Sequence, residues 1–408
     1  MRPGRKLSAA ALVALLALSS ACASEDGGVT DTGTLRWAMW SGSSAETETW
    51  KRIGALAADS GTALELQTTS FNDYWTKTAA QASTGQTACL IGVQSLRVPL
   101  ISSLLRPLDA DLARAGIDAA DFDPSIWKSL RVGGDQLAVP YDYGPQVVLY
   151  NATRFRELGV PLPKPGWTVA DFEAAAKALT RDGRWGFAAN PVIDGVIPWS
   201  LSLQGVNPIG EGGKVDLTQP GFVATMRWYV DLIGKQRVAP PVQATSDMTP
   251  GISGLISGSV AMTVDGPWQL VNVMDQADFE VGVAPLPAGK AGSRSQVAGS
   301  GFGISRTCKD PEAALRALAA ITGPRAAKMM AENGRAYPAR TAQQDAWFSP
   351  ELTAARPGLQ AAISAAVPAR SAASYSTLDQ LFRQYGVPVM NGQEDVSGFL
   401  ESVQQQVN

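Results

Sequence analysis

Residues 138–180 read AVPYDYGPQVVLYNATRFRELGVPLPKPGWTVADFEAAAKALT and carry the strongest fold signal in the chain. Two extended apolar segments surround Pro140 and Gly144, and such a passage is either a hairpin or a strand that leaves one sheet for another. Thr168 then stands as a predicted N-cap with Asp171 at the third helical position, followed by apolar residues on one helical face. The stretch therefore joins β structure to an ordinary packed helix.

The rest of the chain continues the alternation of short apolar strands with amphipathic helices. Strands are predicted at 34–39, 63–68, 88–93, 260–264, 279–289 and 299–305, and helices at 44–57, 74–82, 169–179, 223–233 and after Pro311 and Pro324. This alternation is typical of an α/β fold, and its first three strands with their helices predict a βαβαβ unit with a parallel sheet.

Size and charge limit the possible functions. A chain of 408 residues with 45% hydrophobic residues can bury a sizeable core and favours two domains. The net charge of -3 provides no basic field for phosphates, so nucleic acid is not an expected partner.

The first segment has the organisation of a targeting signal. A positive start precedes an apolar stretch at 7–18, and small residues lead into Cys22. The pattern resembles a lipobox in which Cys22 is lipidated and becomes the mature N-terminus, with Ser19 where an aliphatic residue is usual; ordinary signal cleavage is the alternative. Residues 23–33 would then be a tether, and no later stretch has the 18 or more apolar residues of a membrane span.

The sequence lacks the residues that several kinds of catalysis and metal binding require. The chain has no histidine, which excludes Ser-His and Cys-His nucleophiles, His-ligated zinc and imidazole acid-base catalysis. No CxxC, P-loop or GxGxxG pattern is present, so neither a cofactor nor a metal is expected. The remaining enzymatic possibility is a carboxylate pair, as in a glycosidase, and no pair stands out among the 37 acidic residues. We therefore do not expect an enzyme.

Aromatic residues are the most informative excess. The chain has 11 tryptophans and 8 tyrosines, several of them beside turn residues. An aromatic face stacks on the apolar face of a sugar ring, and neighbouring polar side chains can bond hydroxyls. The combination suits a neutral polyol ligand, although most of these aromatics are expected in the core.

With these features in place, the chain resembles family 1 extracellular solute-binding proteins. The passage at 138–180 matches that family's signature, and further landmarks follow in the family's order. They are SGSVAMTVDGPW (257–268), VGVAPLPAG (281–289), GSGFGIS (299–305), DPEAALRALAAIT (310–322) and NGRAYPAR (333–340). The resemblance covers residues 34–408, essentially the whole mature chain.

The resemblance implies a two-lobed fold of the type II periplasmic-binding-protein class, like maltose-binding protein, with a ligand cleft between the lobes. It places the N-terminal lobe at 34–143 and 301–342, the C-terminal lobe at 147–296 and 349–408, and hinge crossings at 144–146, 297–300 and 343–348. A hinge motion would close the lobes on the ligand. The expected partners are a carbohydrate and the permease subunits of an ABC transporter, reached by a lipid-anchored monomer on the extracytoplasmic face of the cell membrane.

The resemblance also nominates ligand-binding residues. Trp268, in the family's GPW position, is the expected sugar-stacking aromatic, and Asp265 either bonds hydroxyls or caps the next helix. The full set is Trp40, Ser41, Gln94, Ser95, Asp142, Tyr143, Asn190, Trp199, Asp265, Trp268, Gly299, Ser300, Arg340 and Tyr375. Core packing, hinge flexibility and, for Arg340, a structural ion pair are the alternatives.

Two cysteines besides Cys22 remain, and the residues alone allow them either to pair or to be small buried side chains. Family members often carry an aspartate where this chain has Cys89. In the implied fold the strand at 299–305 returns beside the third strand, so its far end near Cys308 would meet Cys89. The resemblance therefore predicts a Cys89–Cys308 disulfide.

The leading functional hypothesis is the sugar-binding component of an ABC importer. A solute-binding protein for a glycerol phosphodiester or polyamine is the alternative, and a carboxylate-based glycosidase is a third. A polyamine would require several carboxylates around the aromatics, and the sequence shows no such gathering.

Overall fold

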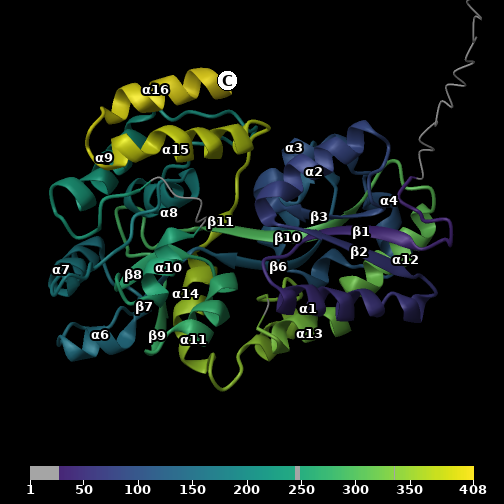
Figure 1. The fold of residues 1–408 in the computed structure, drawn as a ribbon, viewed down its shortest axis with the longest axis horizontal. Helices are drawn as coiled ribbons and strands as arrows, with labels where there is room; N and C mark the ends of the chain where they lie inside the picture. Colours follow the sequence, from purple (N-terminus) through teal and green to yellow (C-terminus); the bar gives the residue numbers. More distant parts are fainter. Residues whose placement is uncertain (1–26, 244–248, 335) are drawn as a thin grey trace, which may run out of the picture.

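Two lobes lie side by side along the long axis of the computed structural model, which describes residues 27–243, 249–334 and 336–408 (Figure 1). The predicted lipidation site Cys22 lies outside these residues. Within the described residues, no helix has both the length and the apolar character needed to cross a membrane.

The first lobe is built on the predicted βαβαβ unit. Strands β1 (Leu35–Trp40), β2 (Leu64–Thr69) and β3 (Leu90–Gln94) are parallel in the order β3-β1-β2, and β10 (Gln296–Ile304) runs antiparallel beside β3. Its main helices are α1 (Ser44–Ala55), α2 (Phe71–Ser83), α3 (Val98–Ile101), α4 (Asp109–Leu112), α5 (Pro124–Ser129), α12 (Pro311–Ile321) and α13 (Pro324–Glu332). The parallel arrangement of the first three strands is confirmed.

The second lobe surrounds a smaller antiparallel sheet in the order β8-β7-β9. Its strands are β7 (Val147–Asn151), β8 (Met262–Asp265) and β9 (Val281–Ala284). Its helices are α6 (Ala152–Glu157), α7 (Val169–Leu179), α8 (Ile193–Gln204), α9 (Pro220–Gly234), α10 (Pro250–Ile256), α11 (Leu270–Gln276), α14 (Arg356–Ala365), α15 (Tyr375–Met390) and α16 (Val396–Val407). Thr168 and Asp171 form the predicted capping box at the start of α7.

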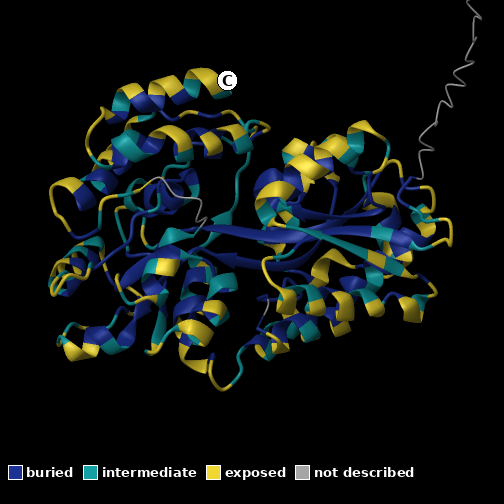
Figure 2. Cartoon of the chain, in the orientation of Figure 1, coloured by how far each residue is buried: buried dark blue, intermediate teal, exposed yellow. Residues whose placement is uncertain are grey.

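The chain passes between the lobes along paired strands. Strand β6 (Val139–Pro145) pairs with β10 in the first sheet, and after Gln146 the chain enters β7 of the second sheet. The passage is therefore a strand that leaves one sheet for another. Strand β11 (Val367–Pro368) also pairs with β10. Strand β10 is buried where the lobes meet, while β11 is partly exposed (Figure 2).

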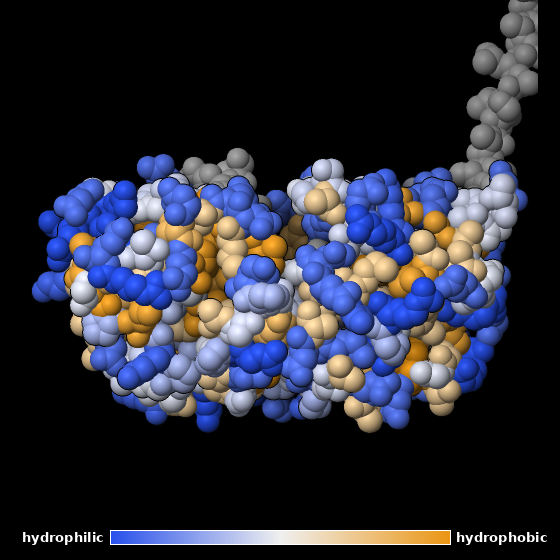
Figure 3. Space-filling view, turned by 90° about the horizontal axis from the view of Figure 1, so that it is seen from below, coloured by the Kyte–Doolittle hydropathy of each residue, from blue (hydrophilic) through white to orange (hydrophobic). Residues whose placement is uncertain are grey.

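A third connection runs along the underside of the molecule. Segment η7 (Thr341–Trp347) packs on α13 of the first lobe, and η8 (Thr353–Ala355) packs on β9 of the second. The underside itself is mostly polar, with scattered apolar patches (Figure 3). The predicted residue limits of the lobes and crossings remain a prediction.

The predicted disulfide between Cys89 and Cys308 is present, with the two Cα atoms 4.7 Å apart. The strand pairing brings the cysteines together, because Ile304 of β10 lies opposite Leu90 of β3. The disulfide thus joins the start of β3 to the segment that follows β10.

Part of the expected tether is packed instead of free. The backbone oxygen of Gly28 accepts a hydrogen bond from Arg36 (2.8 Å), and that of Gly27 accepts one from Lys309 (3.1 Å). Both glycines are buried beside the disulfide segment. Residues 27 and 28 therefore belong to the first lobe, because their backbone oxygens find partners there.

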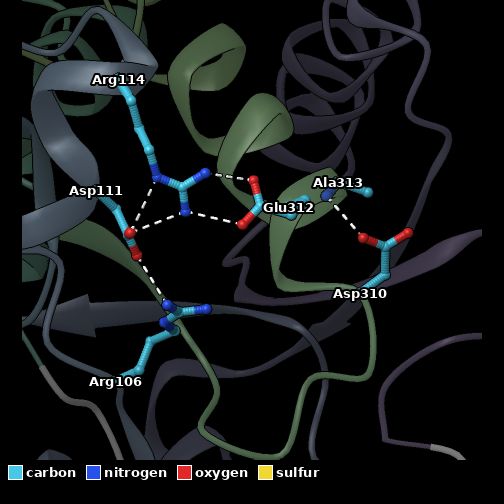
Figure 4. A network of polar contacts seen from close by, with 6 residues as sticks. All are labelled: Arg106, Asp111, Arg114, Asp310, Glu312 and Ala313. Carbon is cyan, nitrogen blue, oxygen red and sulfur yellow. Dashed lines mark hydrogen bonds and ion pairs between the residues drawn. The ribbon is translucent and has the colours of Figure 1, made fainter.

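An ion-pair network ties α12 to the segment around α4 (Figure 4). Arg114 bonds the carboxylates of Asp111 and Glu312, and Arg106 bonds Asp111 at 2.8 Å. The side chains of Arg114 and Glu312 are 45% and 57% exposed, so solvent screening keeps the contribution of this pair to stability small. The network belongs to the outer surface of the first lobe.

Candidate ligand-binding site

The turn after β8 presents a tryptophan at the junction of the lobes. Trp268 is partly exposed, and a Cβ atom on Gly266 would lie 2.2 Å from its ring, so only glycine leaves room for this ring position. A Cβ atom on Gly144 of the crossing strand β6 would lie 2.3 Å from Pro267 Cγ. Two glycines therefore allow this turn to pack directly against a crossing strand.

Asp265 lies at the base of this turn. Its Oδ1 accepts a hydrogen bond from the Gly266 backbone N–H (2.7 Å). Burial raises the pKa of Asp265 to about 6, opposed by the hydrogen bonds from Gly266 and the Trp268 side chain, while the charge of Asp194 adds to the increase. The site thus holds a carboxylate that is costly to ionise.

Asp194 lies in the first turn of α8 in the same region. Its Oδ1 accepts a hydrogen bond from the hydroxyl of Tyr375, and its backbone oxygen accepts one from Gln146 Nε2 (2.8 Å) in the crossing segment. Burial raises the pKa of Asp194 to about 6, and the nearby charge of Asp379 adds to this. Two carboxylates with raised pKa values therefore lie close enough to influence each other.

The facing side of the first lobe is aromatic. Trp40, at the end of β1, packs edge-on against Phe71 at a centroid distance of 5.4 Å and at a tilt against Trp75 at 5.6 Å. The guanidinium of Arg97 lies 5.0 Å from the Phe71 ring centroid and 5.3 Å from that of Trp75, within the range of cation–π attraction.

Arg97 and its neighbours reach from the first lobe to the second. Arg97 bonds Gln94 Oε1 (3.1 Å) at the end of β3, and its Nη2 lies 3.9 Å from Asp379 Oδ2 in α15. The Ser371 hydroxyl, just before α15, bonds the backbone oxygen of Leu96. Segment η2 (Ser95–Arg97) and the start of α15 therefore bring the two lobes into contact beside Asp194.

A family model described as bacterial extracellular solute-binding protein matches residues 51–361, about three quarters of the chain. The chain belongs to this family.

One curated relative is an uncharacterized lipoprotein in the oleD 5' region of Streptomyces antibioticus, 28% identical over 216 residues. The match covers 51% of this chain and 48% of the relative, so it spans about half the length of that protein.

Solved structures match over nearly the whole chain. The substrate-binding protein Lmo0181 from Listeria monocytogenes, in complex with cycloalternan, has a TM-score of 0.82 at 19% identity, covering 92% of this chain and 98% of its own. The GacH receptor of Streptomyces glaucescens, studied unliganded and with acarbose, has a TM-score of 0.78 at 21% identity, and the match covers 91% of this chain and 97% of the receptor. UgpB from Mycobacterium tuberculosis, in complex with glycerophosphocholine, has a TM-score of 0.75 at 18% identity, and the match covers 92% of this chain and 97% of UgpB. At these identities the matches establish the two-lobed fold.

The structure brings some of the predicted residues of this solute-binding protein together. Trp40 and Gln94 lie on the first-lobe side, and Asp265, Trp268 and Tyr375 lie on the second-lobe side. Their roles in binding remain a prediction.

Other predicted residues are already engaged in holding the crossing strands together. Ser95 Oγ accepts from the Gly299 N–H (3.2 Å), and Asp142 Oδ1 accepts from the Ser300 N–H (2.7 Å). A Cβ atom on Gly299 would lie 2.5 Å from the Asp142 backbone oxygen. The backbone N–H groups of Gly299 and Ser300 thus have protein partners, and a role for these residues in binding remains a prediction.

Three further predicted residues are buried and held by protein contacts, and a role in binding for each remains a prediction. Trp199 is fully buried in the second-lobe core. Arg340 bonds the Thr322 backbone oxygen (2.7 Å) and Asp121 Oδ2 (2.8 Å), so it is the structural ion pair that was the alternative. Tyr143 is buried with its hydroxyl bonded by Gln344 (3.0 Å), and burial raises its pKa well above the usual range.

Ser41 and Asn190 have local roles. The Ser41 hydroxyl donates to the Ser43 backbone oxygen (2.8 Å) and lies 2.8 Å from Thr47 Oγ1. Its hydrogen bonds are therefore made at the start of α1. The Asn190 backbone N–H donates to the Tyr229 hydroxyl (2.7 Å), while its side-chain oxygen is buried with no protein partner among the described residues. Within the described part of the chain, neither side chain forms a hydrogen bond with Asp194, Asp265 or Arg97.

Four residues of the site were not predicted, namely Trp75, Arg97, Asp194 and Asp379. Asp194 had a recognisable signal, because it is the only charged residue in the apolar run PVIDGVIPW (191–199). Arg97 follows Gln94 at the carboxyl end of the third strand, where ligand-binding loops gather in α/β sheets. Asp379 lies far from both in sequence, and only the fold brings it near them.

The raised carboxyl pKa values predict a specific pH dependence of stability. A carboxyl whose pKa rises from an unfolded value near 4 to about 6 on folding opposes folding above pH 6, and this penalty is lost as the pH falls toward 4. Asp265→Asn should therefore stabilise the ligand-free protein at pH 7.5 by about 1 to 3 kcal/mol, at 1.4 kcal/mol per pKa unit. Near pH 4 the variant should match the wild type. Urea unfolding at both pH values measures this, and an unchanged or lower stability at pH 7.5 would contradict it.

Proposed function

We propose that this chain is the extracytoplasmic substrate-binding component of an ABC importer and that it binds a carbohydrate between its lobes. The observation that carries this proposal is the partly exposed Trp268, placed beside Asp265 and Asp194 and supported by two glycines that permit the turn. An indole face with neighbouring carboxylates provides both kinds of contact that a sugar ring makes, because one surface stacks and the others accept hydroxyl protons.

The relatives support a sugar as the ligand class. Two of the matching structures are described with cycloalternan or acarbose. UgpB is described with glycerophosphocholine, which keeps a glycerol phosphodiester as the second candidate. Asp194 and Asp265 oppose this candidate, since two carboxylates beside the same site repel a phosphate.

Closure and delivery follow from the arrangement of the lobes. We place the hinge crossings at 144–146, 297–300 and 343–348, so that the ligand contacts both lobes only in the closed form. A permease outside this chain would read that form. Binding without turnover is the expected chemistry, because solute-binding proteins retain their ligands unchanged.

The proposed location is the extracytoplasmic face of the cell membrane. The apolar stretch at 7–18 followed by Cys22 supports lipid anchoring, as does the lipoprotein relative. Mass spectrometry of the N-terminal peptide tests this, since a Cys22→Ala variant should lose the lipid and leave the membrane fraction.

A thermal-shift screen tests the proposed function. Mono-, di- and oligosaccharides are added in excess to the soluble chain, together with glycerophosphocholine and spermidine. A sugar that binds the native state raises the melting temperature, because ligand binding stabilises that state by mass action. A shift with a phosphodiester and with none of the sugars would contradict the carbohydrate assignment.

Trp268→Ala should weaken sugar binding by about 1 to 3 kcal/mol, the usual cost of removing an anchor residue from a binding site. The fold should be little affected, because the Trp268 side chain is partly exposed in the free protein. Isothermal titration calorimetry with the best sugar from the screen measures the loss. An unchanged affinity accompanied by a large fall in melting temperature would show that Trp268 is a core residue.

A further inference from the structure

The carboxylates of the site lack cationic partners of their own. Among the described residues, neither Asp194 nor Asp265 forms a salt bridge. The two arginines of this region, Arg97 and Arg383, both engage Asp379 instead, at 3.9 Å and 3.0 Å. The negative charge of Asp194 and Asp265 is therefore not matched by a contacting cation within the described chain.

Two unsatisfied acceptors lie near Asp194. The Asp379 Oδ1 atom is buried without a hydrogen-bond donor among the described residues, and so is Gln146 Oε1. Only 7% of Asp379 and 9% of Gln146 is exposed. Gln146 directly bonds the backbone of Asp194 through its other side-chain atom, and the charge of Asp379 is felt by Asp194. A buried acceptor without a donor is costly, so a ligand that brings donors close to Asp194 would be favoured.

A metal ion does not account for these acceptors. The described residues contain no group of three or more carboxylate, cysteine or histidine side chains that could hold a metal ion. The Trp268 ring at the same site favours an organic cation, because an indole face attracts an ammonium group.

We propose that this site selects a sugar that carries a protonated amine, with the amine held at the carboxylates of Asp194 and Asp265. The inference rests on the proposed function and narrows its ligand class. An ammonium group supplies three donors and one positive charge, which matches carboxylates that form no salt bridge among the described residues. A neutral hydroxyl supplies a single donor and no charge.

The geometry also bears on polyamines as an alternative ligand class. Carboxylates gathered around aromatic side chains were absent from the sequence pattern, yet the fold places Asp194, Asp265 and Asp379 near Trp268 and Tyr375. A linear polyamine lacks the ring hydroxyls and the apolar ring face that the rest of the site would contact. We therefore favour the amino sugar and include spermidine in the test.

The preference for an amino sugar over a neutral sugar should depend on pH, and the charged groups around the two carboxylates determine how. Asp379 and Tyr375 face Asp194 from α15, Arg97 faces it from the first lobe, and Arg383 lies further along α15. Asp265 is influenced by Asp194 and by the Trp268 side chain. With a pKa of about 6 for both carboxyls, they are ionised at pH 7 and mostly neutral at pH 5. The preference for an amine should therefore be strong at pH 7 and weak at pH 5.

The test compares matched sugar pairs by isothermal titration calorimetry. The pairs are D-glucosamine with D-glucose, D-galactosamine with D-galactose and the β-1,4 glucosamine dimer with cellobiose, with spermidine as a further probe. The amino member of the bound pair should bind at least about tenfold more tightly at pH 7, as expected for a charge-assisted contact. At pH 5 the ratio should fall toward one.

Matched variants separate this charge effect from a change in folding. Asp265→Asn and Asp194→Asn should each reduce the amine-to-neutral ratio at pH 7, while Asp59→Asn, an exposed carboxylate on the outer surface, should leave it unchanged. Melting temperatures of all three variants confirm that they fold.

Two results would overturn the inference in distinguishable ways. Equal binding of both members of a pair, or a ratio that persists in both Asn variants, would overturn the amine preference and leave the proposed function intact. Binding of spermidine with none of the sugars would overturn the proposed function and the amino-sugar assignment together.

Discussion

Replacing Trp199 by alanine is expected to destabilise the protein by about 3 to 5 kcal/mol, the range for deleting a buried aromatic side chain. Trp199 is fully buried in α8, where its ring lies 4.8 Å from that of Phe172 and 5.0 Å from that of Trp228, measured between centroids. Removal leaves a cavity that these neighbouring rings can only partly fill. Urea or thermal unfolding measures the loss.

Trp268→Ala is the matched control for this variant. The two variants should differ in what they lose. Trp199→Ala should lower the stability and leave the sugar affinity of the folded protein nearly unchanged, whereas Trp268→Ala should lower the sugar affinity and leave the stability nearly unchanged. A tenfold loss of affinity in Trp199→Ala at full folding would contradict its assignment to the core.

Removing the Cys89–Cys308 disulfide should cost up to about 5 kcal/mol in the chain-entropy model, because the bond closes a loop between residues 219 apart in sequence. The double variant Cys89→Ser with Cys308→Ser should therefore unfold at a lower urea concentration than the oxidised wild type. The affinity for the ligand should change little, since the disulfide joins the start of β3 to the segment after β10, at the opposite end of these strands from Gln94.

Reduced wild-type protein provides the control for the disulfide. Dithiothreitol should lower the stability of the wild type to that of the double variant and leave the variant unaffected. Two free thiols titrated in the unreduced, denatured wild type would contradict the pairing.

The local features of this fold were predictable from sequence. Capping residues such as Thr168 with Asp171, and short apolar strands between helices, depend on neighbouring residues and therefore show in the sequence. The disulfide was predictable because strand pairing in the implied fold fixes which strand ends meet. The position of Trp268 after a Gly-Pro turn was equally local.

What the sequence did not reveal are contacts made across the fold. Trp199 lies in a helix that is apolar on nearly all sides, so its sequence did not distinguish a cleft position from a core position. Arg340 is held by Asp121 and Thr322 from separate segments, and its guanidinium also lies 4.4 Å from the centroid of the Phe122 ring. The approach of Arg97 to Asp379 depends on how the two lobes sit together. None of these contacts leaves a periodic or local signal.

The crystal structure of the protein with the best sugar from the screen tests the central claim most directly. We expect one sugar between the lobes, in contact with the Trp268 ring and the Asp265 carboxylate and with a first-lobe residue near Arg97. Sugar density in the surface groove between α9 and α16, lined by Pro220, Arg227 and Glu401, and none beside Trp268 would contradict it.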